Sequence, residues 1–85
     1  MRRDAEFFGD QELDLIYIAK RLRDALRLEK ALTSANLDFA VQTETYRGGI
    51  IFPSDRVGAF FYVAPAIAAA ARDVAKSIGL RPYDV

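Results

Sequence analysis

The spacing of apolar residues divides the first half of the chain into a strand and a helix. Residues 13–20 (LDLIYIAK) are rich in β-branched and aromatic side chains and too few for a typical helix, so they predict a strand. Residues 21–35 place apolar side chains at helical spacing, with charged side chains on the other faces. They predict the first helix, and its apolar stripe would contain Leu22, Ala25, Leu26, Leu32 and Ala35.

The second half of the chain continues with strands and a helix. Residues 37–46 alternate in character, which is typical of a half-exposed strand and therefore indicates a sheet edge. The run from Ala59 to Val63 is apolar throughout and predicts a strand that is covered on both faces. Pro65 suits the first turn of a second helix, and Gly79 is placed to end it in a left-handed cap. The apolar stripe of this helix would contain Ile67, Ala71, Val74 and Ile78.

The predicted order of elements specifies a fold class. Residues 80–85 form a short last strand, which Pro82 restricts to an edge position. Strand, helix, strand, strand, helix, strand is the βαββαβ pattern of the ferredoxin-like α+β sandwich. Right-handed crossovers then place the first and third strands in the centre, giving an antiparallel sheet in the order 4-1-3-2. Residues 13–85 would form this single domain, preceded by a loosely held N-terminal tail, residues 1–12, whose pair Phe7-Phe8 docks on the body.

The connection between the second and third strands has two interpretations. In the favoured one, residues 47–58 form an excursion that packs Ile50-Ile51-Phe52 back onto the sheet. In the other, the two strands form one long hairpin with a bulge at Gly48-Gly49 and a four-residue turn at residues 53–56. Three consecutive apolar side chains point in opposed directions, so the domain's own end or a partner is expected to cover them.

Composition excludes several classes of chemistry. The chain has 85 residues, enough for one small domain, and 12 basic residues balance 12 acidic ones. Neither nucleic acid nor an anionic membrane is therefore an expected partner. The absence of cysteine and histidine excludes thiolate catalysis, the Ser-His-Asp triad and the commonest zinc ligands. No apolar run is long enough for a signal peptide or a membrane span, which predicts a soluble cytoplasmic protein.

Charged residues suggest two sites, and only one of them is retained. Lys20, Arg21 and Arg23 lie near the predicted helix start, where free backbone N–H groups also favour anions, so a phosphate or carboxylate ligand is a candidate partner. A solvated helix face is the alternative explanation of this cluster. The carboxylates Asp10, Glu12 and Asp14 alternate, but they lack the glycine and the closing glutamate of a calcium loop and are interpreted as solubilising residues. No catalytic constellation, metal site or cofactor is predicted.

One stretch of the sequence resembles a known family. "YIAKRLRDALRLEKALTSANLDFAVQTETY" is similar to the opening of small bacterial proteins with a PII-nitrogen-regulator-like, ferredoxin-like fold, described as signal transducers. The family's helix and strand correspond here to residues 22–37 and 39–46, and its variable loop to residues 47–58. This chain has Asn36 where a glycine is usual in the family. The resemblance implies the fold and a regulatory role, and it carries over no site residues.

Two alternatives share the predicted fold. Residues 16–21 and 56–63 partly match the two strand signatures of RNA-recognition motifs, and Tyr17 and Phe60 would offer two stacking rings on one sheet face. Gly58 and Val63 stand where further stacking aromatics belong, and the net charge is zero. The other alternative is a small dimeric α+β-barrel enzyme, in which Tyr17, Tyr62 and Arg47 line a cavity between sheets.

The favoured interpretation is a non-enzymatic regulatory or protein-interaction module that acts as a homodimer. A two-layer sandwich has helices for only one face of its sheet, and the other face would leave large apolar side chains exposed. A second copy related by a two-fold axis would cover that face. The predicted interface residues are Tyr17, Ile50, Ile51, Phe52, Phe60 and Tyr62.

Overall fold

The protein is an α+β domain with a three-stranded antiparallel sheet and two α-helices. The computed structural model describes residues 1–48 and 54–83, with the backbone alone at residues 46–48 and 54–56. Its elements are the 3₁₀ turn η1 (Ala5–Phe8), β1 (Asp14–Ala19), α1 (Leu22–Ser34), β2 (Ala40–Gly48), β3 (Ser54–Val63), the 3₁₀ turn η2 (Pro65–Ile67) and α2 (Ala68–Ser77).

The sheet has the order β1-β3-β2, with β3 in the centre. This confirms that the first and third predicted strands are neighbours and that the second lies at an edge of this sheet. The predicted fourth strand is not formed among the described residues 80–83. These residues do return to the sheet, because the Tyr83 N–H donates a hydrogen bond of 2.7 Å to the carbonyl of Ile16 in β1.

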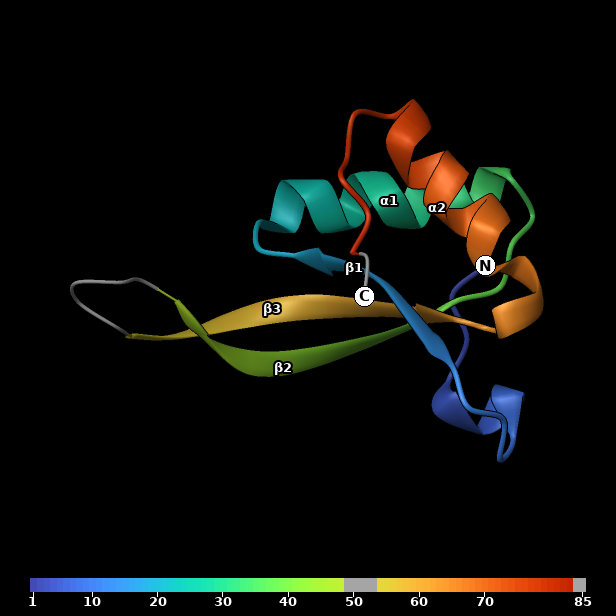
Figure 1. The fold of residues 1–85 in the computed structure, drawn as a ribbon, viewed down its shortest axis with the longest axis horizontal. Helices are drawn as coiled ribbons and strands as arrows, with labels where there is room; N and C mark the ends of the chain where they lie inside the picture. Colours follow the sequence, from blue (N-terminus) through green and yellow to red (C-terminus); the bar gives the residue numbers. More distant parts are fainter. Residues whose placement is uncertain (49–53, 84–85) are drawn as a thin grey trace.

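Strands β2 and β3 form one long hairpin, so the predicted excursion over residues 47–58 is wrong. Their pairing runs without interruption from Ala40↔Tyr62 to Gly48↔Ser54. Residues 54–56 belong to β3 and do not form the predicted turn, and Ile50-Ile51-Phe52 lie outside the described residues. The outer part of the hairpin projects beyond the helices (Figure 1). Polar residues are common in a hairpin that projects into solvent, so the polar residues of this segment did not indicate the end of a strand.

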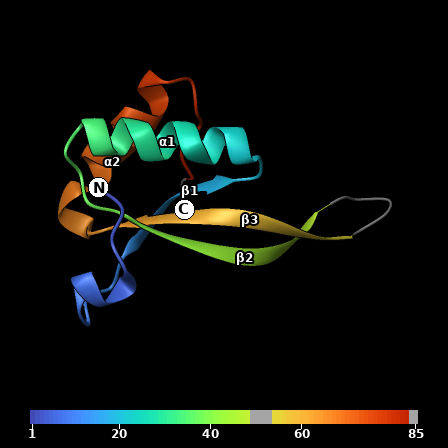
Figure 2. The same cartoon turned by 180° about the vertical axis from the view of Figure 1, so that it is seen from behind.

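Both helices lie on the same side of the sheet (Figures 1 and 2). Alanines at one-turn spacing, Ala68, Ala71 and Ala75, form the buried line of α2. Of the predicted stripe only Ala71 is buried, and the others, Ile67, Val74 and Ile78, are partly buried against the core. In α1 the buried residues are Ala25, Leu28 and Leu32. The predicted stripe was therefore partly wrong, because Leu22 and Leu26 are 75% and 55% exposed and Ala35 is also exposed. At about 100° per residue, Leu26 lies roughly 200° around the helix from Leu28, so one face cannot bury both.

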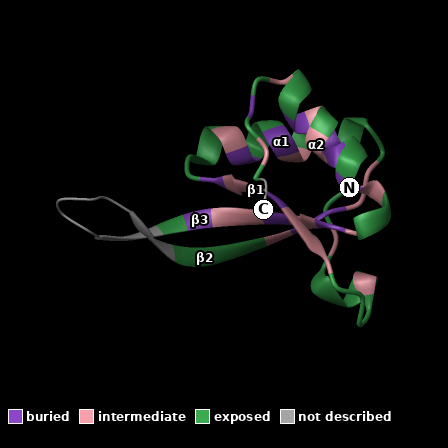
Figure 3. Cartoon of the chain, in the orientation of Figure 1, coloured by how far each residue is buried: buried purple, intermediate pink, exposed green. Residues whose placement is uncertain are grey.

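The core is concentrated between the helices and the inner part of the sheet (Figure 3). At its centre the rings of Phe39 and Phe61 stack with centroids 5.8 Å apart, and both side chains are fully buried. Aliphatic side chains from the helices and from the first and third strands surround this pair, and those with no exposed surface are Ile16, Leu28, Leu32, Val63, Ala71 and Ala75.

A β-bulge in β1 changes which side chains face the helices. Leu15 pairs with Tyr62 and Tyr17 pairs with Phe61, so Ile16 is an extra residue in the ladder. Ile16 is fully buried in the core, and the ring of Tyr17 contacts that of Phe61 edge-on at 6.3 Å. Consecutive residues therefore face the same side at this point. Tyr17 therefore lies on the helix side of the sheet, and the prediction that it shares a sheet face with Phe60 is wrong.

The N-terminal residues are attached to the start of β2. The N–H of Arg3 donates to the carbonyl of Phe39 at 2.7 Å, and the N–H of Phe39 donates to the carbonyl of Met1 at 3.1 Å. The Arg3 guanidinium also contacts the Asp38 carboxylate at 3.0 Å and the Phe7 ring at 4.6 Å. These contacts hold the segment on the domain, in contrast to the loosely held tail that the sequence predicted.

Both helices end in the same left-handed cap. At the end of α2, Gly79 has φ 82°, and the N–H of Leu80 reaches back to the carbonyl of Ala75 at 3.0 Å. At the end of α1, Asn36 has φ 60° and the N–H of Leu37 bonds to the carbonyl of Leu32, also at 3.0 Å. This pattern is the Schellman motif. The prediction that Gly79 ends the second helix with positive φ is confirmed.

We expect Gly79→Ala to lower the free energy of unfolding by about 1 kcal/mol, because a Cβ is disfavoured at positive φ. No atom lies within 4 Å of the added carbon, so the cost is conformational and not a clash. Asn36→Gly is the matched opposite change and should raise stability by a few tenths to about 1 kcal/mol. Urea denaturation of the two variants measures both effects. Equal stability of Gly79→Ala and the parent protein would contradict the assignment of the cap.

Candidate interaction surfaces

The sheet face opposite the helices carries a contiguous group of apolar side chains. The register places Leu15 of β1 beside Tyr62 of β3, and Ile18 beside Phe60. All four are partly exposed, and they come from adjacent strands on the side that neither helix covers (Figures 1 and 2). We call Leu15, Ile18, Phe60 and Tyr62 the open-face cluster.

Polar groups and the N-terminal turn border this cluster. The hydroxyl of Tyr62 donates a hydrogen bond of 3.2 Å to the carboxylate of Glu44 on β2. Burial, together with this bond, raises the pKa of Tyr62 above its usual value, so the hydroxyl stays a donor at neutral pH. A cavity of about 260 Å³ separates the sheet from η1, and it is lined by Ala5, Leu13, Ala40, Gln42 and Tyr62. The open-face cluster therefore has a polar rim along β2 and is bounded by η1 at one end.

The structure separates the predicted interface residues into two groups. Phe60 and Tyr62 lie together in the open-face cluster, as predicted. Tyr17 lies on the other face, against Phe61, because the bulge at Ile16 reverses the alternation of β1. Burial raises the pKa of the Tyr17 hydroxyl in this position. The remaining predicted residues, Ile50, Ile51 and Phe52, lie outside the described part of the chain.

The same geometry corrects the two alternatives from the sequence. RNA-recognition motifs need stacking rings from both central strands on one face, but Tyr17 and Phe60 lie on opposite faces. The positions of β1 on the open face are the aliphatic Leu15 and Ile18. Tyr17 and Tyr62 are likewise on opposite faces, so they cannot line one cavity between sheets, and the side chain of Arg47 is not described.

The predicted anion-binding residues lie at the start of α1, as expected. Lys20 and Arg21 line a cavity of about 280 Å³ together with Arg81, which the sequence did not suggest. The bond from Tyr83 to β1 brings Arg81 to this place, and only the fold of the C-terminal segment reveals it. Arg23 does not line this cavity, and its guanidinium lies 4.0 Å from the carboxylate of Asp24. Asp24 also lines the cavity, so the local charge is mixed.

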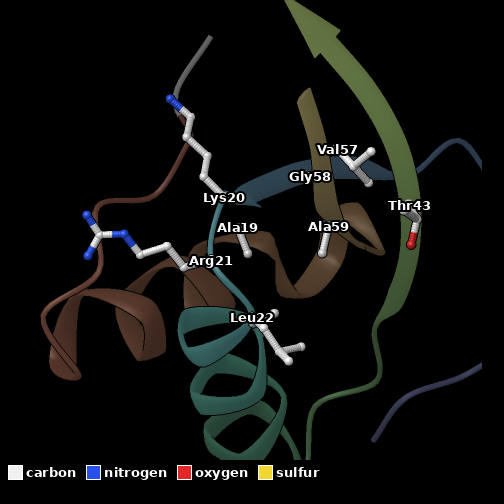
Figure 4. Close-up of a pocket in the computed structure, with 9 residues that line it drawn as sticks. Ala19, Lys20, Arg21, Leu22, Thr43, Val57, Gly58 and Ala59 are labelled. Atoms are coloured by element: carbon white, nitrogen blue, oxygen red, sulfur yellow. The ribbon is translucent and has the colours of Figure 1, made fainter. Parts of the chain in front are cut away.

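A second apolar surface lies where α1 begins and the hairpin projects. A cavity of about 230 Å³ is lined by residues of both elements. In Figure 4 Leu22 reaches from the first turn of α1 toward the strands, whereas the charged ends of Lys20 and Arg21 extend away. We call this cavity the hairpin groove; its lining is Ala19, Lys20, Arg21, Leu22, Ala25, Thr43, Val57, Gly58 and Ala59. The sequence interpretation missed it because it placed Leu22 and Leu26 in the core.

Two further searches of the described residues gave no site. Within residues 1–48 and 54–83, no group of three or more histidine, cysteine, aspartate or glutamate side chains is placed to hold a metal ion. This includes the alternating carboxylates at Asp10, Glu12 and Asp14. None of the helices in the same part of the chain is long and apolar enough to cross a membrane.

Comparisons with known protein families, with characterised proteins and with solved structures found no match to this chain. The resemblance to PII-like regulators therefore stays a prediction from the sequence. The open-face cluster and the candidate anion site are the features from which a function is proposed.

Proposed function

We propose that this protein is a non-enzymatic regulatory or protein-interaction module that works as a homodimer, joined through the open-face cluster. The observation that supports this proposal is the position of Phe60 and Tyr62 beside Ile18 and Leu15 on the uncovered face of the sheet. A second copy related by a two-fold axis covers this surface with an identical one, and this is the commonest symmetry of oligomers.

The size of the open-face cluster predicts a dimer of modest affinity. Four partly exposed apolar side chains offer roughly 200 Å² per copy, which at about 25 cal/mol/Å² contributes about 5 kcal/mol for each copy. The two copies together contribute about 10 kcal/mol, against association costs of about 4–15 kcal/mol. At the lower association cost the balance is about −6 kcal/mol, a dissociation constant of about 40 μM, so the dimer is expected to be weak, as suits an exchangeable regulatory partner.

The finer fold assignment is part of the proposal. A fourth strand formed by the last residues would give the ferredoxin-like order 4-1-3-2 and the fold of the PII-like regulators. The bond between the Tyr83 N–H and the Ile16 carbonyl supports it, because it brings the segment to the free edge of β1. A small anionic ligand, the other partner expected of such a regulator, would meet Lys20, Arg21 and Arg81 beside this edge.

Phe60→Lys tests the proposed dimer. A lysine in the centre of the open-face cluster places a charge in an apolar interface, so we expect the sedimenting mass of the assembly to fall by half. Thr33→Lys adds the same charge to an exposed position of α1 and should leave the mass unchanged. Sedimentation equilibrium at about 200 μM, roughly five times the dissociation constant expected at the lower association cost, is the measurement, and circular dichroism verifies that each variant is folded. An unchanged mass for folded Phe60→Lys would refute the sheet-face dimer.

A further inference from the structure

The outer part of β3 has a backbone edge without a partner strand in the described structure. Pairing with β1 ends at Ala19↔Ala59, whereas β3 continues outward to Ser54 with only β2 beside it. Every second residue of a strand directs its N–H and C=O groups to the same side. The segment Ser54–Gly58, which we call the hairpin edge, therefore presents backbone donors and acceptors on the side away from β2.

Exposed apolar side chains lie next to this edge. Val57 of the hairpin edge is 64% exposed and lines the hairpin groove with Leu22, which is 75% exposed. Leu26, at 55%, follows Leu22 by one helical turn. These are three of the six large apolar side chains that are exposed in the described chain. A free strand edge beside exposed apolar residues is the arrangement that favours pairing with another chain.

We propose that the hairpin edge is a second self-association surface, at which Ser54–Gly58 of two copies pair antiparallel about a two-fold axis. Leu22, Leu26 and Val57 of each copy then lie over the joined strands. This inference goes beyond the sheet-face dimer, because it uses different residues on the helix side of the molecule. It is a form of strand addition in which main-chain hydrogen bonds supply affinity and neighbouring pockets supply specificity.

A second copy fits this surface for two reasons. The edge requires an extended backbone, and each copy supplies the same extended segment, so one antiparallel pairing satisfies both edges at once. Charge also permits the contact. The chain has a net charge of zero, and the hairpin edge contains one acidic and one basic residue, Asp55 and Arg56. The paired strands therefore meet without an excess of like charge, and the charged ends of Lys20 and Arg21, which also line the groove, extend away from the strands (Figure 4).

The available area is sufficient for a specific but reversible contact. Typical side-chain areas scaled by the exposed fractions give on the order of 300 Å² of apolar surface per copy, the size of a functional patch. The paired backbone adds further area, which brings the contact toward the lower end of stable interfaces, at about 600 Å² per partner.

Two separate two-fold surfaces on one chain have a consequence for assembly. A chain that pairs through the open-face cluster and also through the hairpin edge forms assemblies larger than a dimer, and perpendicular axes close them at four copies. Loss of either surface leaves the dimer formed by the other. The sheet-face dimer and the hairpin-edge contact can therefore be tested separately.

Sedimentation equilibrium of the parent protein and four variants at about 200 μM, the concentration used for the sheet-face dimer, tests the inference. The double variant Leu22→Lys/Val57→Lys changes only exposed positions, so the domain should stay folded. We expect this variant and Phe60→Lys each to have half the mass of the parent assembly, and the combination of all three substitutions to be monomeric. Thr33→Lys, which adds the same charge to an exposed position near the other end of α1, should again change nothing.

The outcomes assign failure to one proposal or the other. If Leu22→Lys/Val57→Lys keeps the parent mass, the hairpin edge is not an interface, whatever Phe60→Lys does. If Phe60→Lys alone keeps the parent mass, only the sheet-face dimer is refuted. A monomeric parent protein overturns both. As an independent measurement, backbone amides of Ser54–Gly58 should exchange at least tenfold more slowly in the parent assembly than in the double variant, and equal rates would contradict the pairing.

Discussion

Replacing Phe61 with alanine is expected to lower the free energy of unfolding by about 3–5 kcal/mol, a large share of the stability of a small domain. The side chain is fully buried, stacks on Phe39 at 5.8 Å and contacts the ring of Tyr17 at 6.3 Å. It also lies in the central strand, so a cavity there adjoins both neighbouring strands. Truncation of a buried phenylalanine costs about 3–5 kcal/mol, and domains of this size have only about 5–10 kcal/mol of total stability.

The adjacent residue provides the control. Phe60 faces the opposite side of the sheet and is partly exposed, so Phe60→Ala should cost about 1 kcal/mol or less in a dilute monomer. Urea denaturation followed by circular dichroism gives both values. Similar losses for the two variants would mean that Phe61 is not on the core face, or that Phe60 is not on the open face, as described.

The second large effect is expected in α1. Leu28 is fully buried, whereas Leu26 is 55% exposed. Leu28→Ala removes core contacts and should lower the free energy of unfolding by about 2–5 kcal/mol. Leu26→Ala should change it by about 0.5 kcal/mol or less, because surface substitutions away from special features have small effects. The two leucines have the same chemistry and helical propensity, so the difference reports the orientation of the helix alone.

Thermal and urea unfolding of both leucine variants gives these values. A low protein concentration keeps the chains monomeric, so that self-association does not contribute to the difference. A larger loss for Leu26→Ala than for Leu28→Ala would show that the helix is rotated, as the sequence interpretation assumed. The result therefore also decides whether Leu26 is free to contribute to a surface beside the hairpin groove.

Local signals in the sequence were sufficient for much of the fold. The prediction placed Phe60 and Tyr62 together in one interface, which matches their shared face of β3, and Pro65 and Gly79 marked the ends of the second helical segment. The first helix was predicted within one residue of its observed ends, Leu22 and Ser34. These features depend on side-chain periodicity and on backbone preferences of single residues, which are visible without a partner element.

The errors concern properties that depend on other parts of the chain. The bulge at Ile16 is defined by the register against β3, so no pattern within residues 13–20 reveals it. The buried face of α1 was ambiguous because its leucines are spread over an arc of about 160°, and packing against the sheet selected Leu28 over Leu26. Arg81 joined the candidate anion site only through the return of the C-terminal segment to β1.

The central position of β3 determines the order in which the sheet is able to form. Its pairing with β2 closes a short loop between Gly48 and Ser54, and such hairpins form in about 1–10 μs. Pairing with β1 joins Ala19 to Ala59 and closes a much longer loop, at a higher entropic cost. During synthesis β1 and α1 leave the ribosome well before β3. β1 therefore has no strand to pair with until most of the chain has been made, and the early half depends on the late half for its place in the sheet.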